Sequence, residues 1–168
     1  MNANKENIFD CIDKFENHIK DVVLSNQNLL KLIALPSNNP YNEPDIDNVS
    51  ALVDDYIYFK PVAFENTVEY QKCFLLLNMT CIPIYNKSNY ITLSVEFYII
   101  VHNKLIKLED GSNRMYKICS EIQNSLNEAT GDWLGEIKFS DFRNTLVPTV
   151  YYGSTLKYQL THFRWLYV

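Results

Sequence analysis

The chain has 168 residues, a formal net charge of -5 and a hydrophobic content of 47%. This length is typical of one domain, and the acidic balance argues against a protein that grips nucleic acid through its phosphates, because such binding needs clustered lysines and arginines. Charged residues interrupt the N-terminus every few positions, so neither a signal peptide nor a membrane-spanning segment is expected there.

Helical spacing of apolar residues predicts an amphipathic helix over residues 5–34. Its apolar stripe includes Ile8, Ile12, Phe15, Ile19 and Val22. The pattern allows a break in this helix near Ser25–Asn26. The helix should end ahead of Pro36, because the residue before a proline is pushed out of helical conformation.

Residues 36–53 have neither a helical nor a strand period and are rich in proline, asparagine and aspartate. This composition predicts a long loop, and loops of that length in compact domains tend to be functional or disordered. Tyr41 and Ile46 are able to anchor it. We therefore expect an ordered arm that packs on another part of the protein, with a floppy connection as the alternative.

Strand patterns dominate residues 55–103. Residues 56–62 predict a first strand, and Pro61 confines that part of it to a sheet edge because proline cannot donate to a ladder. Residues 74–85 are partly apolar on both alternating faces. This second strand should therefore be covered on both sides somewhere along its length.

Residues 86–89 predict a hairpin loop, and residues 91–102 predict the strand that follows it. The odd positions of this strand are apolar, so one of its faces lies in a core. Glu96, Tyr98 and His102 lie on the other face and come closest to a catalytic constellation. However, Glu96 and His102 are about 20 Å apart at roughly 3.3 Å per residue. We therefore expect His102 to be a surface or interface histidine.

A second amphipathic helix is predicted over residues 112–129. Ser112 is a suitable N-cap, and Gly131 lies where a C-terminal cap is expected. The apolar stripe of this helix consists of Met115, Ile118, Cys119, Ile122 and Leu126.

Strand patterns return in residues 134–167. We expect three pieces in this region: 135–139, 146–152 and 154–167. Gly153 should form a turn between the last two pieces. The alternation changes phase within the final piece, and a bulge near Thr161–His162 would reconcile the two phases.

These elements predict a single α+β domain over residues 1–168. An antiparallel or mixed β-sheet with a long hairpin would pack against the two amphipathic helices. No internal repeat is visible in the sequence.

The sequence contains no recognisable catalytic, cofactor or metal motif. The four glycines form neither a phosphate loop nor a dinucleotide fingerprint, and no serine nucleophile elbow occurs. The cysteines form no CxxC pair, which argues against zinc and predicts four reduced, buried thiols. These are Cys11, Cys73, Cys81 and Cys119. We therefore expect no enzymatic activity, no cofactor and no bound metal.

The C-terminus ends in aromatic residues that should pack on the core of the chain or on another subunit, since aromatic side chains are enriched at interface centres. The arm and the mixed face of the strand over residues 91–102 offer further contact residues. The candidate subunit or partner interface consists of Pro40, Tyr41, Pro44, Ile46, Glu96, Tyr98, Ile100, His102, Phe163, Trp165 and Tyr167.

The order and lengths of the elements resemble the tail-terminator and neck (head–tail joining) family of tailed bacteriophages. The resemblance rests on IFDCIDKFENHIKDVVLSNQNLLKLI, the loop NNPYNEPDI, YIYFKPV, the hairpin from FLLLNMTCIPIY into ITLSVEFYIIVHN, the helix NRMYKICSEIQNSL, and closing strands with VYYGSTLKYQL. It covers most of the chain, and it lies in the layout rather than in any diagnostic residue.

The resemblance implies a tail-terminator-like fold and a homo-oligomeric ring, commonly a hexamer. Such a ring ends the tail tube and joins it to the head connector, and genomic DNA passes through its lumen without specific binding. The protein would be assembled in the host cytoplasm and reside in the virion. A head-side connector ring with another copy number is the related alternative. A small-ligand carrier or interaction module, with an apolar pocket lined by Phe and Tyr under a curved sheet, is the rival from another class; a dispersed enzyme site around His102 is weaker.

Overall fold

The computed structural model describes residues 8–60, 71–83, 90–128, 137–145, 147 and 150–164. The helices in these residues are α1 (Ile8–Ser25), α2 (Gln27–Ala34) and α3 (Arg114–Glu128), with short 3-10 turns at Pro40–Asn42, Val49–Leu52 and Asn103–Leu105. The strands are β1 (Ile57–Tyr58), β2 (Cys73–Pro83), β3 (Tyr90–His102), β4 (Ile137–Thr145) and β5 (Tyr151–Arg164). This combination of helices and strands confirms the predicted α+β class.

The strands form one mixed sheet in the order β1-β2-β3-β5-β4. β1 runs parallel to β2, and every other neighbouring pair is antiparallel. The pairing of β2 with β3 extends from Cys73 opposite Val101 to Pro83 opposite Ile91, and these strands are the long hairpin arms that the sequence predicted. The sheet is therefore mixed because of one short edge strand.

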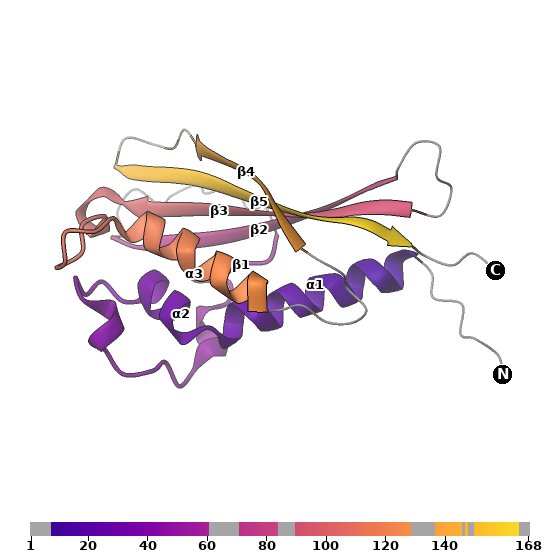
Figure 1. The fold of residues 1–168 in the computed structure, drawn as a ribbon. Coiled ribbons are helices and arrows are strands. Elements are labelled where there is room, and N and C mark those ends of the chain that lie inside the picture. The colour runs from indigo at the N-terminus through magenta and orange to yellow at the C-terminus, as the bar shows by residue number, and fades with distance from the viewer. Residues whose placement is uncertain are drawn as a thin grey trace.

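All three helices cover the same face of the sheet (Figure 1). The alternation predicted for residues 91–102 places the odd side chains of β3 on that face, where they are buried against the helices. The core formed there includes Phe15, Ile19, Leu29, Leu75, Phe97, Ile99, Ile118 and Leu156. A smaller apolar cluster lies on the opposite face and is built on Phe74, Leu76 and Tyr151. β2 is thus covered on both faces over its first half, as predicted.

The predicted break in the first helix lies at Asn26, between α1 and α2. The Asn26 side chain caps α2 by accepting a hydrogen bond from Leu29 N at 2.9 Å. Its Nδ2 donates to Ser125 Oγ of α3 at 2.7 Å. Asparagine is among the best N-cap residues. One side chain therefore both starts α2 and ties it to α3.

Residues 36–53 are ordered and pack back on the domain, which confirms the predicted arm. Tyr41 and Ile46 contact the core, as expected of the two anchors. Ile46 N donates to Gln27 Oε1 at 2.9 Å, while Gln27 Nε2 donates back to Ile46 O at 3.3 Å. This reciprocal pair fastens the middle of the arm to the first turn of α2.

Arg114 holds the other end of the arm and is fully buried. Its guanidinium donates to backbone oxygens of Leu105, Leu32 and Leu35 at 2.8, 2.8 and 2.9 Å, and also to that of Ser37. Two of these oxygens belong to the C-terminal end of α2, where the helix dipole favours a cation. The first residue of α3 thus fixes the point where α2 passes into the arm.

The N-cap predicted for α3 is wrong by one residue. Asn113 Oδ1 accepts a hydrogen bond from Met115 N at 2.9 Å, so Asn113 is the capping side chain. Ser112 instead donates from its hydroxyl and its backbone N–H to Asp110 Oδ1. Because Ser112 is hydrogen-bonded to Asp110 in the preceding turn, the next residue, Asn113, caps the helix.

The described part of the C-terminal region contains two strands, β4 and β5, where the sequence predicted three pieces. Gly153 lies inside β5 rather than in a turn, so that prediction is wrong. A Cβ at Gly153 would lie 2.9 Å from Val147 Cγ1 and 3.0 Å from Thr145 O, and this close approach explains the glycine. The predicted bulge is confirmed: between Leu93 and Ile91 the partner residue moves from Leu160 to Phe163, which leaves one extra residue at Thr161–His162.

Several predicted features lie outside the described residues. They are Pro61, the hairpin loop at 86–89, the C-terminal cap at Gly131, and the side chains of Trp165 and Tyr167. All four cysteines are free thiols, as expected; Cys11 and Cys73 are buried, whereas Cys81 and Cys119 are half-buried. The prediction of four buried thiols is therefore confirmed for two of them.

Candidate interaction face

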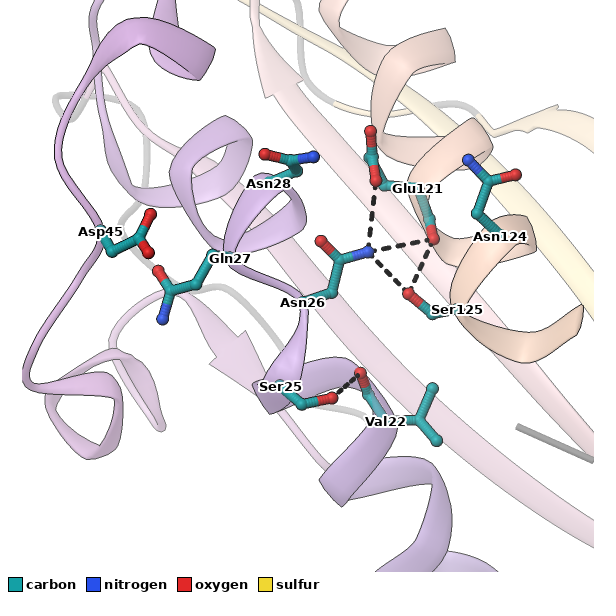
Figure 2. Close-up of a pocket in the computed structure, with 9 residues that line it drawn as sticks. All are labelled: Val22, Ser25, Asn26, Gln27, Asn28, Asp45, Glu121, Asn124 and Ser125. Atoms are coloured by element: carbon teal, nitrogen blue, oxygen red, sulfur yellow. Dashed lines mark hydrogen bonds between the residues drawn. The ribbon is translucent and has the colours of Figure 1, made fainter. Parts of the chain in front are cut away.

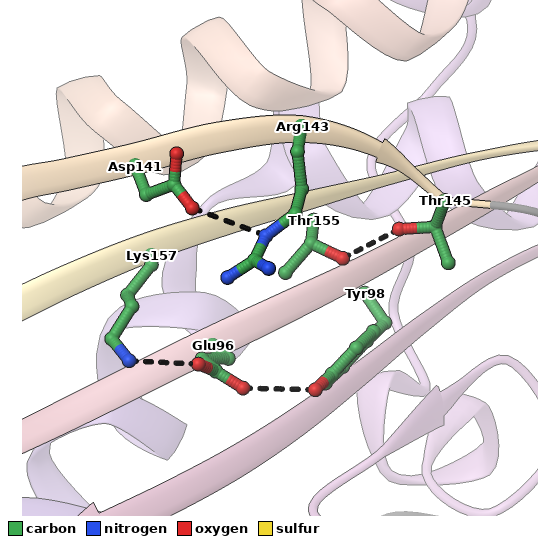
Figure 3. A network of polar contacts seen from close by, with 7 residues as sticks. All are labelled: Glu96, Tyr98, Asp141, Arg143, Thr145, Thr155 and Lys157. Carbon is green, nitrogen blue, oxygen red and sulfur yellow. Dashed lines mark hydrogen bonds and ion pairs between the residues drawn. The ribbon is translucent and has the colours of Figure 1, made fainter.

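The face of the sheet opposite the helices carries a network of polar side chains from β3, β4 and β5 (Figure 3). The strand register aligns these residues in rows across the sheet. Glu96 lies opposite Lys157, and Lys157 lies opposite Asp141. Cross-strand neighbours on one face are close enough to interact, so the alternation of each strand assembles the network.

Glu96 is the centre of this network. Lys157 Nζ donates to its Oε1 at 2.9 Å, and Tyr98 Oη donates to its Oε2 at 2.8 Å. The hydrogen bond from Lys157 lowers the pKa of Glu96, and the bond from Tyr98 adds to this against the opposing effect of burial. Burial, followed by the bond to Glu96, raises the pKa of Tyr98. Glu96 is thus held ionised and Tyr98 held neutral.

The row nearest the β4 edge is also paired. Arg143 Nε lies 3.1 Å from Asp141 Oδ2, and the hydroxyls of Thr145 and Thr155 lie 2.6 Å apart. A bulge in β4 between Phe139 and Asp141 gives Asp141 and Arg143 the phase that faces this network. Positive and negative side chains therefore neutralise one another across the face.

His102 is buried within the subunit, so the surface alternative of the prediction is wrong, whereas the interface alternative stays a prediction. Its Nδ1 accepts a hydrogen bond from Lys104 N at 3.2 Å and begins the 3-10 turn after β3. Its ring packs edge-on against Tyr151, with centroids 5.2 Å apart. Burial, then the charge of Lys104, lowers the pKa of His102. The histidine closes the end of β3 and is not brought to the Glu96 network.

Tyr98 and Ile100, the two neighbours of His102 among the predicted contact residues, are half-buried and pack against the cluster of Phe74, Leu76 and Tyr151. This part of the face is apolar. The side of β3 that carries the candidate residues therefore passes from a charged centre at Glu96 to an apolar end at Ile100.

The candidate residues of the arm point mostly inward. Pro40 is buried, whereas Tyr41 and Ile46 are half-buried as anchors, and only Pro44 is exposed. Tyr41 Oη donates to Glu121 Oε1 at 3.4 Å. Burial, with the Glu121 charge, raises the pKa of Tyr41 to about 12. Among the candidate contact residues of the arm, Pro44 alone is therefore exposed.

The C-terminal candidates are placed only in part. Phe163 belongs to β5, and its backbone pairs with Ile91. Its side chain, with those of Trp165 and Tyr167, lies outside what the structure describes.

An aromatic patch at the β4 edge was missed by sequence reasoning. We define it as Tyr116, Phe139 and Phe142, which are 55, 53 and 38% exposed. The rings of Tyr116 and Phe142 have centroids 6.3 Å apart. Phe139 and Phe142 are three residues apart, so simple alternation along a strand would place their side chains on opposite faces of the sheet. The bulge in β4 brings both to the helix side, and a sequence search for i, i+3 aromatics around a bulge could have found them.

A cleft of about 750 Å³ lies where α1, α2 and α3 meet (Figure 2). Its lining is almost entirely polar: Val22, Ser25, Asn26, Gln27, Asn28, Asp45, Glu121, Asn124 and Ser125. Asn26 Nδ2 donates hydrogen bonds to Glu121 Oε2 at 3.3 Å and to Ser125 Oγ. The side-chain amide of Gln27 is hydrogen-bonded to the backbone of Ile46. The bonds of Asn26 and Gln27 hold α2 to α3 and to the arm.

Among the described residues, no group of three or more His, Cys, Asp or Glu side chains that could hold a metal ion occurs. None of their helices combines the length and apolar character needed to span a bilayer.

Comparison with known proteins adds one family. No curated protein matches the sequence. Residues 26–160 match the family model named YomW, a name taken from a gene of a Bacillus prophage of the SPBc2 type. The matched region begins at the cap of α2 and ends within β5, so it contains the sheet, the arm and α3. Because the match spans most of the chain, the protein belongs to the phage-associated YomW family.

Proposed function

We propose that this protein is a structural protein of a tailed-phage virion that forms a homo-oligomeric ring, a hexamer, at the head–tail neck. The ring ends the tail tube and joins it to the head connector. Its subunits act through contacts with one another and with these neighbours, and it catalyses no reaction.

Two lines of support come together. The YomW family associates the chain with bacteriophages. In addition, the order of the elements agrees with the layout that the neck resemblance implies: N-terminal helices, an ordered arm, a pair of long strands, a further helix and closing strands. A shared layout supports a fold and only suggests a role, so the role rests on the surfaces described above.

The observation that carries the proposal is the uneven cover of the sheet. The helices occupy one face (Figure 1), and the other face presents neutralised ion pairs beside half-buried aromatic and aliphatic side chains. Such a surface offers no clustered positive charge for holding phosphates. It has the mixed apolar and polar character of protein contacts.

The proposed partners follow from this position. They are other copies of the chain, the tail-tube protein and the connector on the head side. Genomic DNA would pass through the lumen without specific binding, which agrees with the net charge of -5, since a negative wall does not retain DNA. Assembly would take place in the host cytoplasm and the product would reside in the virion.

The small-ligand carrier gains no support from the cleft between the three helices. A carrier requires an apolar pocket with a few polar groups. The cleft in Figure 2 is lined by amides, hydroxyls and carboxylates that bond to one another.

The proposal is tested by the native mass of the purified protein at rising concentration, with particles imaged by negative-stain electron microscopy. Annular particles of six subunits are expected. A strict monomer at every concentration, with no ring after tail tubes or head connectors are added, would contradict it.

A further inference from the structure

The sheet has two outer edges that lack a strand partner among the described residues. Residues 139–145 of β4 pair only with β5, on their inner side. On the other side of the sheet, β1 pairs with β2 only at Leu75 and Leu76, so residues 77–83 of β2 have a neighbour in β3 alone. An edge of this kind is a template for another strand.

Apolar side chains flank both edges. The aromatic patch of Tyr116, Phe139 and Phe142 borders β4, and Met79 and Cys81 are half-buried on the same, helix-covered side of β2. Ile82, on the opposite face of β2, is 53% exposed. At about 150–250 Å² per aromatic side chain, the patch exposes roughly 300 Å², a substantial part of the roughly 800 Å² that a stable interface buries on each partner.

Strand direction makes the two edges compatible. β2, β3, β5 and β4 are antiparallel in succession, so β4 runs opposite to β2 within one subunit. A second copy in the same orientation therefore offers its β2 antiparallel to β4 of the first. Every subunit of a ring has that orientation relative to the ring axis, and an interface between two different surfaces closes into a ring when the rotation permits.

We infer that β4 of one copy pairs antiparallel with residues 77–83 of β2 in a second copy, and that the aromatic patch packs against Met79 and Cys81 of that copy. The inference rests on the proposed ring and names its subunit contact. The paired strands join neighbouring sheets edge to edge, while the aromatic rings supply the desolvated centre of the interface.

Two substitutions on opposite edges test this contact: Phe142→Lys and Ile82→Lys. A lysine at a strand edge opposes edge pairing. Each variant is expected to shift the assembly midpoint to about tenfold higher concentration or more, because Phe142→Lys removes an aromatic anchor and Ile82→Lys places a charge beside the paired strands. Tyr152→Lys is the matched control, because Tyr152 is 55% exposed on β5, which is flanked by β3 and β4. Its midpoint should stay at the wild-type value.

A mixture of the two variants gives the sharper result. Phe142→Lys retains an intact β2 edge and Ile82→Lys retains an intact β4 edge, so an equal mixture is expected to form heterodimers but no rings. Thermal melting of each variant establishes that it is folded. Tyr116→Lys, on the surface of α3, repeats the β4 test without altering a strand.

Three results would overturn the inference. Rings that persist in both variants would exclude the edge contact while leaving the proposed ring intact. Loss of assembly in Phe142→Lys but not in Ile82→Lys would indicate β4 pairing with β4. A wild-type protein that stays monomeric with and without tail tubes or connectors would contradict both the contact and the proposed function.

Discussion

Arg114 Nη1 donates a hydrogen bond to the backbone oxygen of Leu32 at 2.8 Å, which joins the start of α3 to the end of α2 across 82 positions of sequence. The other bonds of the guanidinium go to further backbone oxygens, those of Leu105, Leu35 and Ser37. Burial lowers the pKa of Arg114 from its ordinary value, yet an arginine stays protonated in proteins. The charge is therefore solvated by the backbone in place of water.

We expect Arg114→Met to reduce the free energy of unfolding by about 3 kcal/mol or more, because several buried carbonyl oxygens lose their donor. Arg114→Lys should restore only part of it, since an ammonium lacks the planar fork. Urea denaturation measures the change. Arg143→Met, at an exposed arginine, is the control and should stay within about 0.5 kcal/mol of wild type. Equal effects at the two positions would contradict the role of the buried guanidinium.

The burial of Arg114 could not be predicted from the sequence. A charged residue at a helix start is read as solvent-exposed, because only the packing of α2 on α3 reveals its acceptors. The break at Asn26 and the bulge at Thr161–His162 were predictable, since each leaves a local mark: a capping residue in one case and a change of phase in the other.

Long-range contacts account for the predictions that were wrong. Gly153 resembles a turn residue in sequence, but it lies in β5, and the reason for the glycine is the close approach of Val147 and of the backbone of Thr145. His102 lies on the same face of β3 as the half-buried Glu96 and Tyr98, yet Tyr151 of β5 and the turn after β3 bury it. The aromatic patch depends on a bulge in β4 that breaks the period of two. Of the candidate site, the polar face of β3 was predicted and its partners on β4 and β5 were not.

Gly153→Ala is expected to reduce the free energy of unfolding by about 1–3 kcal/mol, because the new Cβ would overlap Val147 Cγ1 and Thr145 O. Thermal or chemical denaturation measures the loss. Ser154→Ala is the matched control at the next position of β5, because it removes a hydroxyl without adding a Cβ. If Gly153→Ala were as stable as the control, the close approach would not be the reason for the glycine.

Tyr158→Phe should leave stability unchanged within about 0.5 kcal/mol or raise it, because the buried hydroxyl of Tyr158 finds no partner in the described part of the chain. Its ring contacts with Phe97 and Phe139 remain in the variant. Tyr98→Phe, by contrast, removes the bond to Glu96 and should cost about 1 kcal/mol. Comparing the two urea midpoints checks both. A large loss in Tyr158→Phe would indicate a partner for that hydroxyl.

Acid should weaken the Glu96 network. The folded-state pKa of Glu96 lies below its ordinary value of 4.5, so its contribution is fully present above pH 4.5 and is lost as the pH falls through the lowered value. We expect Glu96→Gln to be less stable than wild type by about 1 kcal/mol at pH 7, after allowance for solvent screening, and the difference to shrink below pH 4.5. Unfolding free energies measured across this range test the sign; a difference that grows in acid would contradict it.

Assembly should distinguish the open face from the buried histidine. Tyr98→Asp places a second carboxylate beside Glu96 and removes a half-buried ring, so we expect the proposed ring to be weakened by about tenfold or more in concentration. His102→Ala removes a turn cap and a ring contact inside the subunit, and should lower the melting temperature while rings still form. Tyr98→Phe controls for loss of the hydroxyl alone and should assemble.

Native mass and melting temperature, measured on the same samples, separate the two kinds of effect. If Tyr98→Asp formed rings as readily as wild type, the face around Glu96 would have no part in subunit contact, and the β4 and β2 edges would have to supply the interface. If His102→Ala melted like wild type but did not assemble, the imidazole would act at an interface despite its burial. The combination expected from the structure is the reverse, because Tyr98 borders the solvent-facing network and His102 is enclosed by Tyr151 and the turn after β3.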